Sequence, residues 1–453
     1  MPATPRRRSR VPAGRVERLA RLGLLAAELA AGGLYEGARR AFGVGTAAAQ
    51  GASALLSPAN AKRLTRRLSQ LRGAAMKLGQ LLSLESADIL PPEFAEALAA
   101  LRASADTMPA SQLRRVLGRE YGKGWEARFE RFDFEPIAAA SIGQVHAVRT
   151  RDGRELALKI QYPGVARSID SDVDNVAALL HVSRILPVEI DVSGIVAEAK
   201  RQLRAEADYL AEAANLRRFR ALVADEPALW VPRVHDDLTT RRVLAMDFAA
   251  GVPIEELGER GAQQARRDAV GALLQRLMFR EIFEFRFVQT DPNFANYLVE
   301  PESGRLLLLD FGATRAYDAD FIAHYAELCR GVMRGDRGGV RDAAVAIGYL
   351  RRDDPEGRVA AAVDLMFLVC EPLVHAGPYD FARTTLAVRA RDAGLDLAFR
   401  KGFLRAPPAE TVFLHRKLVG TFLLSGRIRA RVDVHALLEP LLNRAADPAP
   451  SPR

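Results

Sequence analysis

Apolar and polar residues follow two different periods along this 453-residue chain, and the changes of period predict its elements. From Val16 to about Arg102 the apolar positions recur at helical spacing, in a background rich in Ala, Leu, Arg and Glu. A short helix is predicted to begin after Met108-Pro109 and to end near Gly122. Residues 129–163 instead alternate apolar with polar side chains around an Arg151-Asp152-Gly153 turn, which is typical of antiparallel strands.

The rest of the chain is predicted to be mostly helical. Helices are expected over residues 168–222, over 254–285 and from 319 to about 442, with short strands within 231–248. Between the last two helical regions, residues 287–315 carry two loops on either side of a run of four leucines. We therefore predict an α+β fold with a small antiparallel-sheet N-lobe, a helical C-lobe and an N-terminal helical extension.

The composition is that of a globular protein and excludes several other classes. Apolar residues make up 49% of the chain and charged residues 27%, with a formal net charge of +9. The two cysteines, Cys329 and Cys370, form neither a metal-ligand spacing nor a disulfide framework, and no secretory signal is evident, so we expect a cytoplasmic location. Aromatic residues are few and do not alternate with the basic ones, so no nucleic-acid ligand is expected.

The N-terminal segment predicts peripheral contact with a membrane rather than a membrane span. Its first dozen residues carry a basic cluster that would attract anionic lipid, although a disordered solubilising tail has the same composition. The apolar stretch from Leu19 to Gly45 is interrupted by several charges, and each central charge costs about 2.5–3.5 kcal/mol on insertion. We expect an amphipathic helix that lies on a membrane surface, packs on a partner or folds back onto its own domain.

Two short motifs on either side of the leucine run carry the chemistry. "QTDPNFANYLV" contains Asp291 and, five positions later, Asn296, whereas "LLLLDFGATR" contains Asp310 within Asp-Phe-Gly. The same order, D-x-x-x-x-N before D-F-G, forms the catalytic loop and the metal-binding segment of protein kinases. Carboxylate and amide oxygens suit Mg²⁺, so Asn296 and Asp310 are predicted metal ligands, and Asp291 is predicted to act as a base or to orient a nucleophile. Protein kinases have His-Arg before this Asp, where the present chain has Gln289-Thr290.

A lysine and a carboxylate earlier in the chain complete a nucleotide site of this kind. Lys159 lies in the alternating strand "ELALKIQ", like the kinase lysine that contacts the α- and β-phosphates. Glu212, in the helical stretch "AEADYLAEAANLRRF", is the candidate carboxylate that holds this lysine. Read separately, Lys159 also fits an exposed strand edge, and Glu212 a solvent-facing helix position. Their order along the chain, before both motifs, predicts a protein-kinase-like site for ATP and Mg²⁺ in a cleft between two lobes.

The expected phosphate-binding loop lacks the usual glycines. Where protein kinases have G-x-G-x-x-G, this chain has "PIAAASIGQVHAV", whose alanines let the backbone approach phosphate but restrict φ more than glycine does. The candidate nucleotide contacts in this loop are Ala138, Ala139, Ala140 and Ser141. Met246 and Phe248, in the predicted strand "RRVLAMDF", are further candidates. The loop sequence also fits a tight hairpin without a ligand.

Taken together, these motifs resemble the UbiB-type family of atypical kinases, which is tied to ubiquinone (coenzyme Q) biosynthesis. The resemblance covers roughly residues 60–430 and includes the upstream "MKLGQ", which matches the family's K-x-G-Q hallmark at Lys77, Gly79 and Gln80. Many members have H-A-D-P-H-P-G-N in the catalytic loop. "QTDPNFAN" instead resembles the mitochondrial coenzyme Q kinase branch and its bacterial relatives.

The resemblance implies a division of the chain into five regions. Residues 1–55 would form a basic tail and an amphipathic helix, and 56–125 the helical extension that carries K-x-G-Q. Residues 126–248 would form the N-lobe with a helical insertion, 249–442 the helical C-lobe, and 443–453 a disordered tail.

The resemblance also implies a role for each matched residue. Lys159 and Asp291 would be catalytic, Glu212 would hold the lysine, and Asn296 and Asp310 would bind the metal. The K-x-G-Q residues would lie across the active site and block peptide substrates. Their lysine, Lys77, would be held by Glu206 and Asp208. Because these two carboxylates are two positions apart, they could face the same way only at a terminal or distorted helical turn.

The implied activity is that of a Mg²⁺-dependent ATPase or unorthodox kinase that supports ubiquinone biosynthesis. The implied ligands are ATP or ADP and a lipid or quinone precursor, and the implied assembly is a homodimer or a biosynthetic complex. No C-terminal pair of transmembrane helices like that of many bacterial members is evident, so we expect peripheral membrane association. One alternative is a nucleotide-gated scaffold with negligible chemistry. Another is a small-molecule kinase of the aminoglycoside-phosphotransferase type, which shares D-x-x-x-x-N but lacks K-x-G-Q and the alanine loop.

Overall fold

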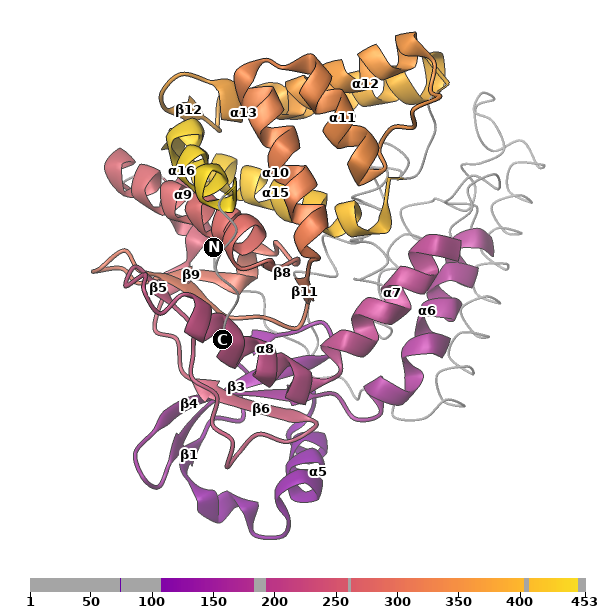
Figure 1. The fold of residues 1–453 in the computed structure, drawn as a ribbon. Helices are drawn as coiled ribbons and strands as arrows, with labels where there is room; N and C mark the ends of the chain where they lie inside the picture. The colour runs from indigo at the N-terminus through magenta and orange to yellow at the C-terminus, as the bar shows by residue number, and fades with distance from the viewer. Residues whose placement is uncertain (1–73, 75–106, 183–192, 260–261, 403–406, 447–453) are drawn as a thin grey trace, which may run out of the picture. The chain divides into compact units, whose positions relative to one another are not determined.

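The structure, a computed structural model, describes residue 74 and residues 107–182, 193–259, 262–402 and 407–446. The chain divides into two compact units. Unit 1 contains the described residues up to Ala214 together with Arg233–Phe248, and unit 2 contains Asn215–Pro232 and the described residues from Ala249 onward. Unit 1 is built on an antiparallel sheet and unit 2 is mostly helical (Figure 1), which confirms the predicted α+β class. The predicted N-terminal amphipathic helix lies outside the described residues.

The sheet of unit 1 has the strand order β1-β3-β4-β6, and β2 pairs with β3. The strands are β1 (Phe129–Phe132), β2 (Ala138–Ala139), β3 (Gly143–Thr150), β4 (Glu155–Gln161) and β6 (Val243–Asp247). The predicted turn between β3 and β4 is present: Gly153 has a φ of 84°, and its N–H donates to the carbonyl oxygen of Thr150 over 3.0 Å. Only glycine adopts this backbone conformation without strain, so the turn fixes the register of the hairpin.

One face of this sheet is covered by the predicted short helix, α5 (Ala110–Tyr121), which ends at Gly122 as expected (Figure 1). Its buried residues Leu113, Val116 and Leu117 are spaced by three and four positions and form one apolar stripe. They pack into a core with alternate residues of β4, among them Leu158. Because side chains alternate across a strand, Lys159 points away from this core, to the opposite face.

Three helices follow the β3–β4 hairpin, where the sequence predicted a single helical region. They are α6 (Val165–Val182), α7 (Ser193–Glu206) and α8 (Tyr209–Leu222), and the boundary between the two units falls within α8, after Ala214. The chain breaks between α7 and α8 at Ala207-Asp208. The side-chain amide of Gln161, in β4, donates to the Ala207 carbonyl oxygen over 2.8 Å and so satisfies a backbone group at the end of α7.

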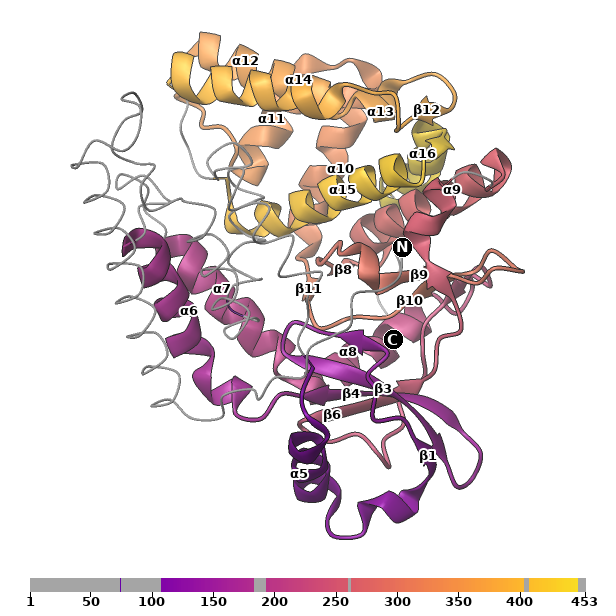
Figure 2. The ribbon, with the colours of Figure 1, turned by 180° about the vertical axis from the view of Figure 1, so that it is seen from behind.

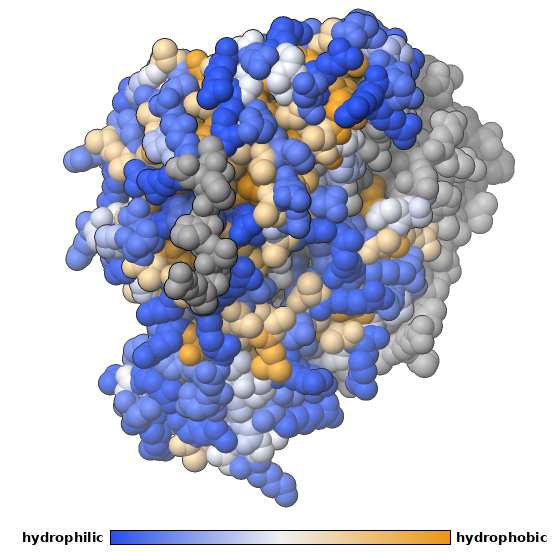
Figure 3. Space-filling view, viewed as in Figure 1, coloured by the Kyte–Doolittle hydropathy of each residue, from blue (hydrophilic) through white to orange (hydrophobic). Residues whose placement is uncertain are grey.

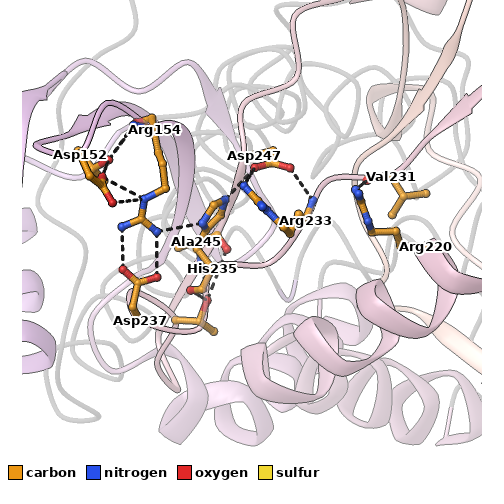
Figure 4. Close-up of polar contacts among 11 residues, drawn as sticks. Asp152, Arg154, Arg220, Val231, Arg233, His235, Asp237, Ala245 and Asp247 are labelled. Carbon is orange, nitrogen blue, oxygen red and sulfur yellow. Dashed lines mark hydrogen bonds and ion pairs between the residues drawn. The ribbon is translucent and has the colours of Figure 1, made fainter.

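A charged network joins the β3–β4 turn to the segment before β6 (Figure 4). The guanidinium of Arg154 donates to both carboxylate oxygens of Asp237, over 3.0 and 2.8 Å, and to Asp152 over 3.0 Å. It also donates to Nδ1 of His235 over 3.1 Å, so this ring donates from Nε2 to Asp247 over 2.7 Å. Hydrogen bonds to the two aspartates raise the pKa of Arg154, and the paired arginine lowers the pKa of Asp237. The network therefore ties two segments that are far apart in the sequence.

Unit 2 contains a small sheet and two strand pairs. The sheet has the order β5-β10-β9-β7, formed by β5 (Leu229–Trp230), β10 (Leu306–Leu308), β9 (Tyr297–Val299) and β7 (Val252–Pro253). The pairs are β8 (Phe287–Gln289) with β11 (Thr314–Ala316), and β12 (Tyr379–Asp380) with β13 (Arg431–Val432). One of the short strands predicted within 231–248 is wrong. This segment, "VPRVHDD" at residues 231–237, contributes only an isolated bridge from Val234 to Met246, within unit 1. The β12–β13 pair was not predicted, since it joins two-residue strands too short for a period to be visible.

The remainder of unit 2 is helical, as the sequence predicts (Figures 1 and 2). Its α-helices are α9 (Gln264–Phe279), α10 (Ala319–Arg334), α11 (Arg337–Ile347), α12 (Glu356–Val369), α13 (Glu371–Val374), α14 (Leu386–Leu395), α15 (Ala409–Arg427) and α16 (Val434–Ala446). A π-helical turn, η4 (Arg280–Glu284), extends α9, and a 3-10 turn, η5 (Phe294–Asn296), precedes β9. Among the described residues, no helix combines the length and the apolar character that a membrane span requires.

A buried polar network in β3 surrounds His146. His146 is fully buried, with Nδ1 2.7 Å from the carbonyl oxygen of Asp133 and Nε2 2.7 Å from the side-chain nitrogen of Gln144. Because the Gln144 amide nitrogen donates, Nε2 accepts and Nδ1 carries the single ring proton. Burial lowers the pKa of His146, so the folded state keeps this ring neutral.

We expect unit 1 to lose stability as the pH falls below about 6.5, the ordinary pKa of histidine. In that window the unfolded chain binds a proton that folded His146 excludes, so the free energy of unfolding decreases with falling pH. Trp125 and Trp230 are the two tryptophans, and Trp125 lies 5.2 Å from the ring of Phe132 in unit 1. Urea unfolding of a Trp230→Phe chain, followed by Trp125 fluorescence, should show this decrease between about pH 7.5 and about pH 5.5. The decrease should be smaller when His146→Gln is added, and an equal decrease would contradict the assignment.

Candidate functional site

Lys159 and Glu212 form a buried ion pair in unit 1. The lysine Nζ lies 2.7 Å from Oε1 of Glu212, and the two side chains are 9% and 0% exposed. The Tyr209 ring lies 5.4 Å from the same nitrogen. The structure therefore excludes the exposed-edge and solvent-facing alternatives for these residues. Breaking such a pair leaves an uncompensated buried charge at a cost of about 3–5 kcal/mol, so the geometry of this lysine is strongly held.

The alanine-rich segment forms a tight hairpin between β2 and β3. Ala138 and Ala139 pair with β3, and the Ala140 N–H donates to the Gly143 carbonyl oxygen over 2.9 Å. The Ser141 hydroxyl donates to the carboxylate of Glu206, which fixes the tip of the hairpin.

Gly143 lets the hairpin approach β4 closely. A Cβ at Gly143 would lie 2.5 Å from the carbonyl oxygen of Ile160 and 2.8 Å from the Tyr209 hydroxyl. Both distances are shorter than van der Waals contact, so this position requires glycine. The hairpin is thus held by the contact of Ser141 with Glu206 and by the close packing of Gly143 on β4. A glycine-rich loop would have more conformational freedom.

Glu206 and Asp208 lie on either side of the break between α7 and α8. Glu206 is the last residue of α7, and the Asp208 carboxylate accepts the N–H of Ala211 over 3.1 Å at the start of α8. This break is a distorted helical turn of the kind that would allow two carboxylates two positions apart to face the same way. The K-x-G-Q residues Lys77, Gly79 and Gln80 lie outside the described residues, so the contact of this pair with Lys77 stays a prediction.

The last two predicted nucleotide contacts lie at the end of β6. Met246 is 7% exposed and pairs with Ala157 of β4. Phe248 is 39% exposed, and its N–H donates to the Glu155 carbonyl oxygen over 3.2 Å. These residues share the sheet of Lys159.

Asp291, Asn296 and Asp310 come together in unit 2. The Asn296 amide nitrogen donates to the backbone oxygen of Asp291 over 3.2 Å, which leaves the amide oxygen for another partner. One carboxylate oxygen of Asp310 accepts the Gly312 N–H over 2.9 Å, within the Asp-Phe-Gly turn. Both predicted metal ligands are therefore oriented by backbone groups.

The side chain of Gln289 joins the two motifs. Its amide nitrogen donates to the backbone oxygens of Asp291, over 2.8 Å, and Asp310, over 3.3 Å. Thr290 adds two bonds to the Ala313 carbonyl oxygen, from its N–H over 2.8 Å and from its hydroxyl over 2.7 Å. Gln-Thr thus has a structural role where protein kinases have His-Arg. The sequence showed that these residues were unusual but did not reveal this bridge.

An arginine that the sequence analysis missed contacts the predicted catalytic carboxylate. Arg416, on α15, donates to Oδ1 of Asp291 over 2.6 Å, and the two side chains are 6% and 17% exposed. With 58 arginines in the chain, composition gave no signal for this one.

A second buried ion pair supports the loop that carries Asp291. Lys417, beside Arg416 on α15, lies 2.8 Å from Oε1 of Glu281, and the other oxygen of that carboxylate accepts the N–H of Gln289 over 2.9 Å. Burial alone would lower the pKa of Lys417, but Glu281 and the hydroxyl of Tyr297 outweigh it and raise that pKa. The available signals were the position of Glu281 directly before the mostly apolar stretch "IFEFRFV" and the scarcity of lysine in the chain.

The Asp-Phe-Gly phenylalanine is packed inside unit 2. Phe311 is 1% exposed, and its ring centroid lies 4.6 Å from that of Phe219 in α8. The side-chain amide of Asn215, also in α8, donates to the Phe311 carbonyl oxygen over 3.1 Å. These contacts fix the segment that carries Asp310.

The residues around Asp310 fit a hard cation. Gln289, Asn296 and Asp310 border one small cavity, and the buried Oε1 of Gln289 has no hydrogen-bond partner among the described residues. Carboxylate and amide oxygens are the donors that Mg²⁺ prefers. No group of three or more His, Cys, Asp or Glu side chains within the described ranges could hold a metal ion. A cation here would therefore complete its coordination with phosphate oxygens and water.

Comparison with known proteins identifies the family. The ABC1 atypical kinase-like domain family matches residues 100–344. Atypical kinase COQ8B, mitochondrial, of Rattus norvegicus is 40% identical over 438 residues, which cover 97% of this chain and 82% of the relative. Atypical kinase COQ8, mitochondrial, of Saccharomyces cerevisiae is 38% identical over 440 residues, which cover 96% of this chain and 86% of the relative.

A solved structure shares the fold. The complex of Rv3197 with erythromycin from Mycobacterium tuberculosis aligns with a TM-score of 0.59 and 29% identity, covering 87% of this chain and 99% of that one. It supports the kinase-like fold predicted from the sequence. The chain belongs to the ABC1, or UbiB-type, family of atypical kinases and is a kinase-type phosphotransferase.

Proposed function

We propose that this protein binds Mg-ATP, transfers or hydrolyses its terminal phosphate, and thereby supports ubiquinone biosynthesis. The support for the ubiquinone role is the 36–40% identity to relatives named COQ8 or COQ8B. The single observation that carries the chemistry is the pair of hydrogen bonds from Gln289 to the Asp291 and Asp310 backbones. This bridge holds the two acidic motifs at a fixed spacing, which phosphoryl transfer requires of its catalytic groups.

Each part of the site has a chemical task in this proposal. Lys159, held by Glu212, contacts the α- and β-phosphates, and the hairpin of Ala138–Ser141 with Met246 and Phe248 contacts the rest of the nucleotide. Asn296 and Asp310 hold Mg²⁺, which when bound neutralises charge on the phosphate oxygens. Asp291 accepts a hydrogen bond from the attacking hydroxyl or water and sets its direction. Arg416 fixes the carboxylate of Asp291, which favours an orienting role over full proton removal.

We infer the phosphate acceptor from the family resemblance and not from the geometry of the described residues. In this proposal Lys77, Gly79 and Gln80, with Glu206 and Asp208, lie across the site and exclude peptides. A lipid or a quinone precursor is then the acceptor or the effector, and the protein works at a membrane surface, alone, as a homodimer or in a biosynthetic complex.

A nucleotide-gated scaffold is the second candidate function. The observation that favours it is the short ion pair between Arg416 and Asp291, because this arginine occupies one oxygen of the carboxylate that would otherwise contact the attacking hydroxyl or water. In cells deleted for this gene, an Asp291→Asn chain that restores ubiquinone as fully as the parent would support the scaffold.

The first test of this proposal concerns Asp310→Asn, which removes a negative charge from the predicted cation site. We expect ATP hydrolysis to fall at least about a hundredfold, because the charge on the transferred phosphate is no longer neutralised. Steady-state phosphate release with excess Mg²⁺ is the measurement. Asp353→Asn, in an exposed loop between α11 and α12, is the matched control and should hydrolyse ATP like the parent. Equal rates for Asp310→Asn and the parent would rule out the proposed chemistry.

The second prediction concerns the contact between Arg416 and Asp291. Arg416→Met should lower kcat by about one to two orders of magnitude and leave the KM for ATP nearly unchanged, because only the orientation of Asp291 is lost. Arg416→Lys should recover part of the rate. An unchanged or increased kcat in Arg416→Met would show that this arginine does not position the carboxylate productively.

The third prediction concerns Ala139→Gly in the β2–β3 hairpin. Glycine loosens a loop that the structure holds tightly, so the ratio of ATP to ADP affinity should change several-fold. Calorimetric titration with each nucleotide measures this ratio. Ala127→Gly, at an exposed turn before β1, controls for general backbone loosening. Identical ATP and ADP affinities in Ala139→Gly and the parent would mean that the hairpin does not contact nucleotide.

A further inference from the structure

A large apolar cavity lies among the helices of unit 2, separate from the cavity beside Asp310. Its volume is about 720 Å³, within the range of pockets that enclose small organic ligands. Residues of α9, α10, α12, α14 and α15 line it, and α12 and α14 lie side by side at one end of unit 2 (Figure 2).

No charged side chain is found among the described residues that line this cavity. Its main polar feature is a pair, Tyr349 and His415, whose hydroxyl and Nε2 lie 2.6 Å apart with the rings stacked at 11°. Burial lowers the pKa of His415 to about 4, so the ring is neutral near pH 7. A charged ligand would lose its hydration here without gaining a counter-charge, so the lining selects neutral molecules.

The accessible part of the cavity lining is apolar as well. Much of the surface visible in Figure 3 is hydrophilic, interrupted by apolar side chains. Val369, Val419 and Leu423 line the cavity and are 47%, 47% and 49% exposed. These three side chains offer apolar contact area to a ligand.

Gly394, on α14, shows that the cavity has room at its wall. It lines the cavity, and a Cβ added there meets no atom within 4 Å. The position therefore has room for a side chain to begin at the cavity wall. A substitution here also removes a glycine from a helix, which favours folding.

We propose that this cavity binds a neutral, elongated hydrocarbon molecule with one hydrogen-bonding group, which faces Tyr349 and His415. The hydrocarbon part fills the apolar space and continues along Val369, Val419 and Leu423. The site is distinct from the proposed nucleotide site and does not depend on it.

The test uses the full chain and farnesol, a neutral isoprenoid alcohol, as the probe. Displacement of a neutral fluorescent dye, Nile red, should report farnesol binding to the parent, whereas palmitate, a charged chain of comparable length, should bind at least about tenfold more weakly. Gly394→Phe should reduce farnesol affinity at least about tenfold, because the ring occupies the ligand's volume. Gly357→Phe is the matched control. Gly357 is an exposed glycine near the start of α12 that does not line the cavity, and a Cβ added there also meets no atom within 4 Å.

Three further measurements test the polar contact and separate binding from folding and from nucleotide chemistry. Tyr349→Phe removes the hydroxyl without changing the shape of the cavity, so farnesol should bind about three- to tenfold more weakly while the hydrocarbon farnesene is unaffected. Gly394→Phe should melt at or above the temperature of the parent. Asp310→Asn should bind farnesol like the parent, so failure of the proposed phosphoryl transfer and failure of this site are distinguishable.

Three results would overturn the proposal. One is the absence of farnesol binding by the parent, and another is equal binding by Gly394→Phe. The third is a parent dimer that Gly394→Phe dissociates while farnesol has no effect, since the cavity would then be covered by a second copy of the chain. Farnesol binding that only Gly394→Phe and Tyr349→Phe weaken supports the proposal.

Discussion

The geometry of the acidic site depends on a buried ion pair, Lys417 with Glu281. One oxygen of the Glu281 carboxylate accepts from the lysine, and the other accepts the N–H of Gln289. The Gln289 side chain then holds the backbones of Asp291 and Asp310. A buried pair of this kind contributes little net stability compared with apolar residues, yet removing one partner leaves an unpaired charge. The pair therefore specifies one position of the loop more than it stabilises the fold.

The same physical device recurs at the other half of the proposed nucleotide site. In unit 1 the buried partner of Lys159 is Glu212, on a helix, and the strand that carries the lysine is fixed by the apolar core on its opposite face. In both units a lysine on one element meets a glutamate on another, away from water. Each of these lysines is thus held by a buried glutamate, which keeps it in place in a chain with many alternative arginine and carboxylate contacts.

The sequence predicted the parts of the fold that have a visible period or a turn residue. The β3–β4 hairpin, the helix α5 with its end at Gly122 and the helical character of unit 2 are confirmed. The predicted strand over "VPRVHDD" is wrong because the side chains of Arg233, His235 and Asp237 pair with Asp247 or Arg154, so the alternation there reflects polar contacts rather than a sheet. The strands β12 and β13 have two residues each, which is too short for a hydrophobic period to be visible, so the sequence did not predict them.

Within the candidate site, motifs and their order along the chain predicted the site residues, and packing decides how these residues are held. Asp291, Asn296 and Asp310 were chosen from motif spacing, and Lys159 and Glu212 from their elements and their order along the chain, whereas the contacts of Gln289 and Arg416 required the fold. Arg416 lies 125 residues from Asp291 along the chain, and no local pattern connects them. Long-range polar contacts of this kind depend on which helix faces which loop, and that information is not contained in one stretch of sequence.

One glycine in α15 carries a consequence for efforts to make this protein more robust. A Cβ at Gly420 would lie 2.0 Å from the Cβ of Pro292, the residue that follows Asp291 in the loop. Replacing helical glycines by alanine is a common way to raise melting temperature, since each glycine costs a helix about 0.5–1 kcal/mol. At this position the gain in helix propensity would be offset by the clash with Pro292, which would displace the loop that carries Asp291, so Gly420 is a glycine that such a redesign should keep.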